Sequence, residues 1–328
     1  MSPRSRDEED LHGRPGRGSR PRSRLRPQHL DAKPARVVTV DRGRYACLLD
    51  DGTQIVAMRA RELGRRGVVV GDEVALVGDV AGGPDSLARI VRVEQRRSVL
   101  RRTADDDDPV ERVLVANADL MVVVCAVVDP PPQPRLVDRC LVAACDAGVE
   151  PLLCVTKVDL ASPDELLTRF AAVDVPIVLT GSKKRDDVLD DLLPRLSGRV
   201  SVFVGTSGVG KSTLVNALVP DATQRIGSVS TATGKGMHTT TAAIALPLPG
   251  GGWVVDTPGV RSFGLAHVDR DRLVSCFPDL VGGAADCPGD CDHLDPEVCC
   301  LDEWVADGHA AADRLDSLRR LLVSRATE

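Results

Sequence analysis

One stretch of the chain has the residue types and spacing that grip nucleotide phosphates. Gly205 to Ser212 read GTSGVGKS and match the pattern G-x-x-x-x-G-K-[ST] at every fixed position. An apolar segment precedes this loop and a helical pattern follows it, so backbone N–H groups can converge on phosphate oxygens at a helix N-terminus. Lys211 is expected to reach the β and γ phosphates and Ser212 to ligate Mg²⁺. The predicted phosphate-loop residues are Gly205, Thr206, Ser207, Gly208, Val209, Gly210, Lys211, Ser212 and Thr213.

A second segment, VVDTPG, lies about 45 residues beyond the phosphate loop. It places Asp256 at the end of an apolar strand, where a carboxylate can hold Mg²⁺ through water, and Gly259 can offer its N–H to the γ-phosphate. Between the two segments lies GKGMHTTT, residues 234–241. Its hydroxyls can supply the last Mg²⁺ ligand from a loop that orders around a γ-phosphate, with Thr240 as the first choice and Thr239 as the second.

A base-reading element is expected earlier in the chain, at Thr156-Lys157-Val158-Asp159. Asp159 can accept two hydrogen bonds from guanine, and a site that leaves this carboxylate unpaired would reject adenine. Lys157 is expected to lie along the ring. A second base-side loop is predicted at residues 179–184. The base element precedes the phosphate loop, which inverts the usual order, but a parallel α/β sheet brings all such loops to one edge, so the order is interpreted as a circular permutation.

A different ligand set occurs near the C-terminus, in CPGDCDHLDPEVCC. Three thiolates and an imidazole, from Cys287, Cys291, His293 and Cys299, are the ligands of closed structural zinc sites. Cys300 is the alternative to Cys299 as the fourth ligand. We therefore expect one structural Zn²⁺, with a helical tail from about residue 310 to 324 packed beside it.

The elements that must position these residues follow from apolar patterning. Residues 1–33 form a predicted disordered basic arm, since the six arginines between Leu11 and Leu30 stand among Gly, Pro and Ser without an acid. Short alternating strands with an Asp51-Gly52 hairpin turn predict an OB-fold barrel over residues 34–100. Apolar strands that alternate with amphipathic helices predict a doubly wound parallel sheet over 101–264, and 265–328 form the zinc-binding region.

Composition limits the kind of protein further. The net charge is -6, aromatic residues are 2%, and no run of about 18 apolar residues exists, so membrane insertion, export and base stacking on aromatic platforms are not expected. We expect a cytoplasmic monomer without a membrane partner. An arginine run, Arg89 to Arg102, is a candidate grip on RNA phosphates beside the barrel. Six cysteines outside the zinc cluster are expected to be buried free thiols: Cys47, Cys125, Cys140, Cys145, Cys154 and Cys276.

The barrel, the permuted order, GTSGVGKST, HTTT, DTPGVR and the Cys-Cys-His-Cys tail together resemble the RsgA (YjeQ) family of ribosome small subunit-dependent GTPases. The resemblance implies an α/β fold: a circularly permuted P-loop GTPase domain with an N-terminal OB-fold β-barrel and a C-terminal zinc-binding domain. It also implies binding of GTP and GDP, and a GTP hydrolase that binds the small ribosomal subunit and its rRNA late in assembly and then leaves.

Three features depart from the family's pattern: the residue at position 156, a first zinc spacing of three residues where four is common, and a poorly matched second base-side loop. Thr156 stands where Asn is usual, and the loss of an amide that normally braces the base pocket is expected to weaken guanine affinity modestly. Val260 stands where many GTPases have a glutamine that orients the attacking water. We therefore expect slow hydrolysis by the isolated protein, accelerated when the subunit places His238, or an RNA group, near the γ-phosphate. The alternatives are a zinc-dependent RNA-binding module with a structural nucleotide site, a nucleotide kinase and an ATPase.

Overall fold

The fold is that of a computed structural model, which describes most of the chain after the predicted basic arm. The described residues are 29–64, 67–83, 86–103, 111–181, 188–219, 243–257 and 268–326. Residues 1–28 of the arm lie outside them. Within the described ranges no helix is long and apolar enough to span a bilayer.

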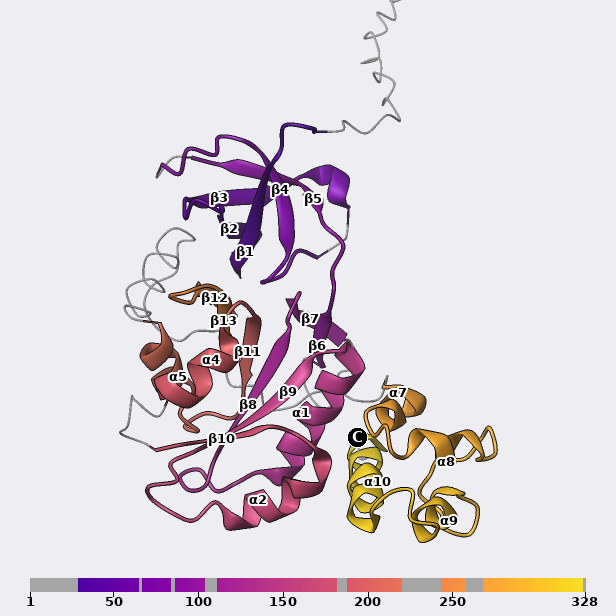
Figure 1. The fold of residues 1–328 in the computed structure, drawn as a ribbon. Helices are drawn as coiled ribbons and strands as arrows, with labels where there is room; N and C mark the ends of the chain where they lie inside the picture. The colour runs from indigo at the N-terminus through magenta and orange to yellow at the C-terminus, as the bar shows by residue number, and fades with distance from the viewer. Residues whose placement is uncertain are drawn as a thin grey trace, which may run out of the picture. The chain divides into compact units, whose positions relative to one another are not determined.

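The N-terminal part is a closed five-stranded barrel, drawn in indigo and purple in Figure 1. Its strands pair in the order β1-β2-β3-β5-β4, and a pairing of β1 with β4 closes the circle. The predicted hairpin at Asp51-Gly52 joins β2 to β3, and Gly52 has a positive φ of 84°. The strands are β1 (Lys33–Asp41), β2 (Arg44–Leu48), β3 (Gln54–Arg59), β4 (Glu73–Gly78) and β5 (Ala88–Val93), with a 3-10 turn η1 at Arg61–Leu63.

A hairpin of β6 (Val99–Thr103) and β7 (Glu111–Ala116) follows the barrel. The arginines near it have partners inside the chain: Arg96 forms an ion pair of 2.7 Å with Asp72, whose side chain is fully buried, and Arg97 one of 2.5 Å with Asp119. A buried carboxylate needs such a partner, because leaving water uncompensated is costly. Arg96 therefore stabilises the barrel from within, and RNA contact by the rest of the arginine run stays a prediction.

The second part is a parallel sheet with helices on both faces, as predicted. Its strands run in the order β10-β9-β8-β11-β13, and among the described strands of this part only β12, which lies next to β13, is antiparallel. They are β8 (Leu120–Ala126), β9 (Glu150–Thr156), β10 (Ile177–Thr180), β11 (Val200–Val204), β12 (Ile244–Pro247) and β13 (Trp253–Asp256).

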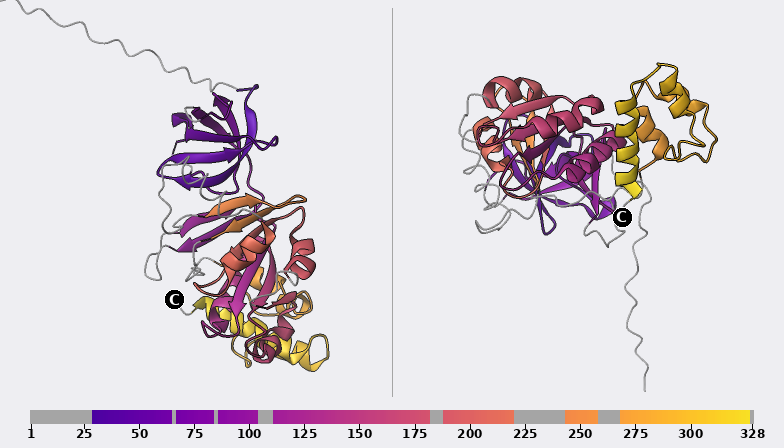
Figure 2. Two further views of the ribbon diagram at one scale, coloured as in Figure 1. Left: turned by 90° about the vertical axis from the view of Figure 1, so that its left-hand side faces the viewer. Right: turned by 90° about the horizontal axis from the view of Figure 1, so that it is seen from below.

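The run of apolar residues in β8 is explained by burial on both faces. Met121, Val123 and Cys125 enter one hydrophobic core, and Leu120, Val122 and Val124 enter the other. A strand covered on both sides has no polar face, so its sequence does not alternate. The flanking helical elements are α1 (Pro134–Ala147), α2 (Asp164–Phe170), η2 (Ala171–Val173), η3 (Val188–Leu192), α4 (Leu193–Leu196) and α5 (Lys211–Leu218). The two views of Figure 2 show helices on both sides of the sheet.

The C-terminal part consists of short helices and one long one. They are α7 (Arg270–Ser275), α8 (Val281–Ala285), α9 (Leu301–Ala306) and α10 (Ala312–Ala326). The predicted helical tail is α10, and its Leu315, Leu318 and Leu321 belong to the same core as Cys299 and one face of β8. Arg320 of α10 also bonds to the buried Asp138 of α1 at 3.1 Å.

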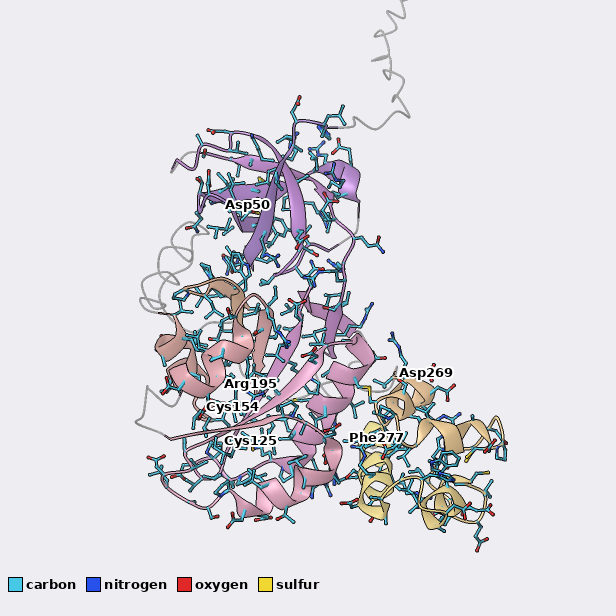
Figure 3. All side chains as sticks on the ribbon, viewed as in Figure 1. Asp50, Cys125, Cys154, Arg195, Asp269 and Phe277 are labelled. Atoms are coloured by element: carbon cyan, nitrogen blue, oxygen red, sulfur yellow. A yellow bond between two sulfur atoms is a disulfide. The ribbon has the colours of Figure 1, made fainter. Side chains whose placement is uncertain are left out.

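The six cysteines outside the C-terminal Cys-His segment divide into two groups. Cys47, Cys125, Cys140 and Cys154 are free and buried, as expected, and Figure 3 labels Cys125 and Cys154 in the region of the central sheet. The expectation of free thiols is wrong for the remaining pair, because Cys145 and Cys276 form a disulfide across 131 residues of sequence. Sequence offered no sign of it, since the two residues meet only through the packing of α7 on α1.

Candidate nucleotide site and metal centre

The predicted nucleotide residues follow strands whose carboxyl ends lie together. Thr156 at the end of β9 is in register with Ala126 of β8 and with Thr180 of β10. On the other side of β8, Val204 pairs with Val123, and Phe203 pairs with Asp256 of β13. The loops that follow β9, β10, β11 and β13 therefore leave the sheet at one edge, which is where parallel α/β sheets bind ligands.

The phosphate loop is shaped by glycines that no other residue can replace without strain. A Cβ on Gly205 would lie 2.4 Å from the carbonyl oxygen of Val124 in the adjacent strand. Gly208 and Gly210 have positive φ values of 84° and 101°. This conformation is open to glycine at little cost. The loop turns over the end of β11 and enters α5 directly at Lys211, so backbone N–H groups at the start of α5 are free of intrahelical partners.

Lys211 is buried at the base of this loop. Its Nζ donates to the carbonyl oxygens of Gly205 at 2.5 Å and Thr206 at 2.9 Å. Burial lowers the pKa of Lys211, and the nearby Asp256 partly offsets this effect. Burial likewise raises the pKa of the Asp256 carboxyl, which Lys211 partly counters. An ammonium and a carboxylate thus lie near each other in a poorly solvated place. There a phosphate would compensate the ammonium strongly, and a divalent cation would compensate the carboxylate strongly.

Thr156 joins the base-reading element to the phosphate loop. Its buried hydroxyl donates a hydrogen bond of 2.6 Å to the carbonyl oxygen of Val209. A Cβ on Gly210 would lie 3.7 Å from the same hydroxyl oxygen, so the two loops are in direct contact. The shorter side chain with a single donor therefore makes a brace of its own, and the expected modest loss of guanine affinity stays a prediction. The sequence alone does not show that the phosphate loop approaches closely enough for this brace.

The remaining base-side residues lie close by. Lys157 has a positive φ of 63°, and its Nζ donates to the carbonyl oxygen of Asp129 in the loop after β8. Asp159 is exposed, and Gly181 of the second base-side loop lies beside it, since a Cβ on Gly181 would be 3.6 Å from its Oδ1. The structure thus brings the two predicted base-side loops together through Asp159 and Gly181. Asp129 carries no motif and was not predicted.

The loop after Asp256 is anchored by a residue that sequence reasoning missed. The buried hydroxyl of Thr257 donates a hydrogen bond of 2.6 Å to the carbonyl oxygen of Phe203. A β-branched hydroxyl directly after a buried strand was the available signal, because a buried O–H requires a partner. The predicted residues His238, Thr239, Thr240 and Gly259, and positions 182–184, lie outside the described residues.

The predicted metal ligands converge into one cluster. The ligand atoms of Cys287, Cys291, His293 and Cys299 all lie within 4.8 Å of one another. The Sγ atoms of Cys287 and Cys299 are 4.0 Å apart, and Cys299 Sγ is 3.7 Å from His293 Nδ1. A tetrahedral zinc ion with bonds of about 2.3 Å to sulfur and about 2.1 Å to nitrogen would separate these atoms by roughly 3.8 and 3.6 Å. The cluster is therefore consistent with zinc.

The surroundings of the cluster suit thiolate ligands and decide between adjacent cysteines. Backbone N–H groups of His293 and Cys300 lie 3.4 and 3.3 Å from the sulfurs of Cys291 and Cys287. Burial raises the pKa of Cys299 to about 12, so a nearby cation is what would keep its sulfur ionised. The thiol of Cys300 instead donates to the carbonyl oxygen of Asp286 at 3.3 Å, which favours Cys299 over Cys300 as the fourth ligand.

Comparison with known proteins agrees with this arrangement. A family model described as RsgA GTPase matches residues 93–266, more than half of the chain. The chain belongs to the RsgA GTPase family. A Pseudomonas aeruginosa protein named small ribosomal subunit biogenesis GTPase RsgA is 39% identical over 264 residues, which cover 78% of this chain and 76% of that protein. A protein of the same name from Ectopseudomonas mendocina is 43% identical over 220 residues, covering 64% of this chain and 63% of the relative.

Two solved structures share the RsgA fold described above. YjeQ from Thermotoga maritima superposes with a TM-score of 0.65 at 26% identity, covering 90% of this chain and 99% of that one. YloQ, whose structure is described as a circularly permuted GTPase, gives a TM-score of 0.64 at 23% identity over 92% of this chain and 98% of its own. The predicted permutation and the predicted family are confirmed. Membership of the RsgA GTPase family implies that the chain binds a nucleotide.

Proposed function

We propose that this protein hydrolyses GTP to GDP and phosphate on the small ribosomal subunit, and that hydrolysis is coupled to late maturation of the subunit and to release of the protein. The curated relatives named small ribosomal subunit biogenesis GTPase support the partner. The observation that carries the nucleotide chemistry is the 2.6 Å bond between Thr156 and Val209, because it joins a base-reading loop to a phosphate loop despite their inverted order.

In this proposal the chain's own groups hold the nucleotide at both ends. Asp159 accepts hydrogen bonds from the guanine ring, and Lys157 covers the ring. Lys211 leaves the Gly205 and Thr206 carbonyl oxygens, which lie 2.5 and 2.9 Å away, for the β and γ phosphates. A phosphate oxygen offers the ammonium a full negative charge in place of two dipoles, so the exchange is favourable.

Mg²⁺ would be held by Ser212, Asp256 and Thr240, and when bound it neutralises charge that develops between the β and γ phosphates. Asp256 suits this role because burial raises its carboxyl pKa, which indicates a carboxylate short of compensating positive charge. The γ-phosphate would be sensed by Gly259 and by residues 234–241. We propose His238, or an RNA group of the subunit, as the group that positions the attacking water, since Val260 lacks a polar side chain.

Each part of the chain has its own role in this proposal. A basic arm (1–33) and a barrel (34–100) would contact rRNA, residues 101–264 would bind and hydrolyse GTP, and residues 265–328 would present one structural Zn²⁺ and a second RNA contact. The protein would act in the cytoplasm as a monomer, because its substrate complex is there and no second copy is needed to complete the site.

GTP turnover measured with and without purified small ribosomal subunits tests this function. We expect Lys211→Ala to lower both rates by about 100-fold or more, as the loss of a charge that stabilises the transition state does. Lys33→Ala is the matched control, since it removes an exposed lysine at the start of β1 and should leave the rate without subunits unchanged. A Lys211→Ala protein that still supports subunit maturation at the normal rate would favour a structural nucleotide over a hydrolytic timer.

A further inference from the structure

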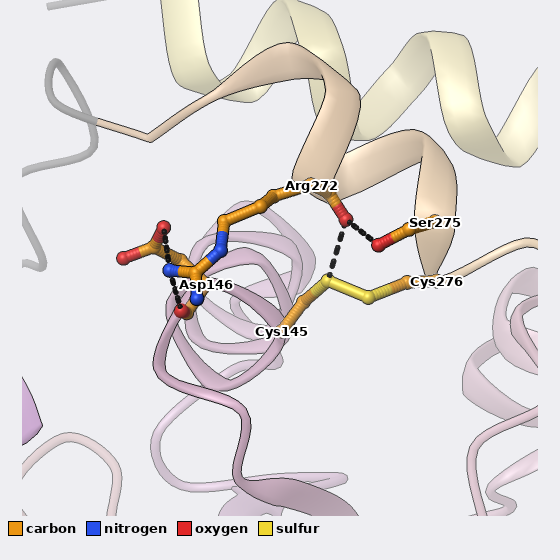
Figure 4. Close-up of a disulfide and its surroundings, with 5 residues drawn as sticks. All are labelled: Cys145, Asp146, Arg272, Ser275 and Cys276. Carbon is orange, nitrogen blue, oxygen red and sulfur yellow. Dashed lines mark hydrogen bonds and ion pairs between the residues drawn. A yellow bond between two sulfur atoms is a disulfide. The ribbon is translucent and has the colours of Figure 1, made fainter. Parts of the chain in front are cut away.

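A disulfide ties the C-terminal part of the chain to the nucleotide-binding sheet. Cys145 lies in the last turn of α1, and Cys276 directly follows α7. Their Cα atoms are 6.5 Å apart, within the range that a disulfide spans without backbone movement. Figure 4 shows this bond with Arg272 and Asp146 beside it. Because 131 residues separate the two cysteines, the bond fixes tertiary packing and not a local turn.

The two ends of the bond belong to helices that pack on each other and that precede and follow the nucleotide motifs in the chain. α1 ends at Ala147, and the next element is β9, which carries Thr156 at its carboxyl end. α7 is the first described helix after β13, which ends at Asp256. The bond therefore joins the flank of the base-reading strand to the segment that follows the predicted γ-phosphate sensor.

Among the cysteines that precede the segment 287–300, this pair is also the one that dissolved reagents can reach. Cys276 is exposed and Cys145 is half-buried. By contrast, Cys47, Cys140 and Cys154 are fully buried, and burial raises the pKa of each thiol well above its ordinary value. Disulfide exchange needs access to sulfur as well as a thiolate, so the described free cysteines of the sheet and barrel are inert where this pair is reactive.

We propose that Cys145 and Cys276 form a reversible redox modification site, a covalent clamp that holds α7 on α1 when oxidised and frees α7 to move when reduced. The regulatory part rests on the proposed function: movement of the zinc-binding part on the small subunit is needed for stimulated turnover, so the oxidised protein is stimulated less. Accessible disulfides in compartments that keep thiols reduced are typically transient and serve redox sensing.

The chemistry balances with common cellular reagents. In oxidation, the two thiols lose two protons and two electrons as the sulfur–sulfur bond forms, and a peroxide takes them up to give two waters. In reduction, the thiolate of a small thiol attacks the exposed Cys276 Sγ, and Cys145 leaves as a thiolate that is then protonated. A second small thiol attacks the sulfur of the first in the mixed disulfide, which releases Cys276 and a small-molecule disulfide.

The reduced state keeps weaker contacts at the same place. Arg272 of α7 donates to the carbonyl oxygen of Asp146 at 2.6 Å and forms an ion pair of 3.3 Å with its carboxylate. The Cys145 sulfur lies 3.4 Å from the Arg272 carbonyl oxygen, to which a free thiol can donate but a disulfide cannot, because it has no S–H. The reduced interface also keeps the buried side chains of Leu273 and Val274 in the core that α1 enters, so α7 stays docked. Without the covalent bond this docking can open, because it depends on apolar packing and an exposed ion pair that stabilises little.

The test uses the full-length, zinc-loaded protein equilibrated with mixtures of reduced and oxidised dithiothreitol. After acid quenching and alkylation, peptide mapping measures the fraction of Cys145 joined to Cys276, and zinc content is measured on the same samples. Amide hydrogen exchange then follows residues 268–280 in the oxidised and reduced protein. Finally, GTP turnover is measured with and without small ribosomal subunits. Cys145→Ser and Cys276→Ser are matched controls, because either one removes the bond without touching a predicted zinc ligand.

We expect the pair to oxidise and reduce reversibly at constant zinc content, and exchange in residues 268–280 to slow by about tenfold or more on oxidation. Subunit-stimulated turnover should fall by at least about threefold on oxidation in the wild type, and in neither serine variant. Failure to form the bond, or equal exchange rates in both states, would overturn the clamp. Equal stimulation in both states would overturn its regulatory role. If no form is stimulated, the proposed function falls, while mapping and exchange still decide the clamp.

Discussion

The hydrogen bond from Thr156 to Val209 offers the sharpest perturbation of the nucleotide site. Thr156→Val keeps the shape and the β-branch but removes the donor, and the Val209 carbonyl oxygen is left without this partner in a buried place. An unsatisfied buried acceptor costs about 1–3 kcal/mol. If the bond acts by holding the two nucleotide loops together, that free energy is lost from nucleotide binding, and the dissociation constant for GDP should rise by roughly 5- to 150-fold.

Isothermal calorimetry with GDP measures this effect, and the unfolding temperature without nucleotide shows how much of the loss falls on the fold instead. Thr156→Ser keeps the hydroxyl and should bind GDP within about twofold of the wild type, because the donor stays in reach of the same carbonyl. Thr156→Asn tests whether an amide makes an equivalent brace. Wild-type affinity in the valine variant, with an unchanged unfolding temperature, would refute the role assigned to this bond.

Three further outcomes follow from the structure. Cys299→Ser should lose most of the bound zinc, as measured by atomic absorption. Cys300→Ser should keep about one ion per chain, because the Cys300 thiol donates to the Asp286 carbonyl oxygen and is not assigned as a ligand. Equal loss of zinc in both variants would contradict the ligand assignment. Asp159→Asn should weaken GDP binding by about 100-fold or more and improve xanthosine nucleotide binding, and retained GDP affinity would argue against its contact with the base. A hydrogen bond from Arg314 lowers the pKa of Asp279 below its ordinary 3.8, so the stabilisation that this carboxylate gives is complete above that pH and is lost as pH falls through the lower value. Asp279→Asn should therefore lower the free energy of unfolding by up to about 1 kcal/mol at pH 7. Urea unfolding should show this difference shrinking as the pH falls below the ordinary carboxyl pKa of 3.8.

Much of the fold could be predicted because its signals are local. The phosphate loop at 205–212, the Gly148 cap that ends α1 and the leucine face of α10 depend on residues close together in sequence. The Gly148 cap has a φ of 64°, as a helix end in the left-handed conformation requires. The motif spacing likewise predicted the residues of the metal cluster, and only the choice between Cys299 and Cys300 was left open.

The features that could not be predicted depend on which segments meet in space. The hydroxyl of Thr156 braces the phosphate loop only because Val209, distant in sequence, turns back over β9. Arg96 looked like part of a solvated run, but Asp72 reaches it from the barrel. Neither pairing follows from the periodicity or the composition of either segment, because both partners lie in loops or at strand ends.

The junction between the barrel and the nucleotide-binding sheet bears on how the protein can be divided. Thr39 of β1 pairs with Ile244 of β12, so the barrel continues the backbone hydrogen bonding of the sheet. β12 is short and largely buried, and the pairing shields its open side. A chain that starts after the barrel would expose that strand as an apolar edge, and such edges recruit other strands. Variants that lack the barrel are therefore expected to self-associate. A loss of activity in such a variant would result from aggregation and not from a missing RNA contact.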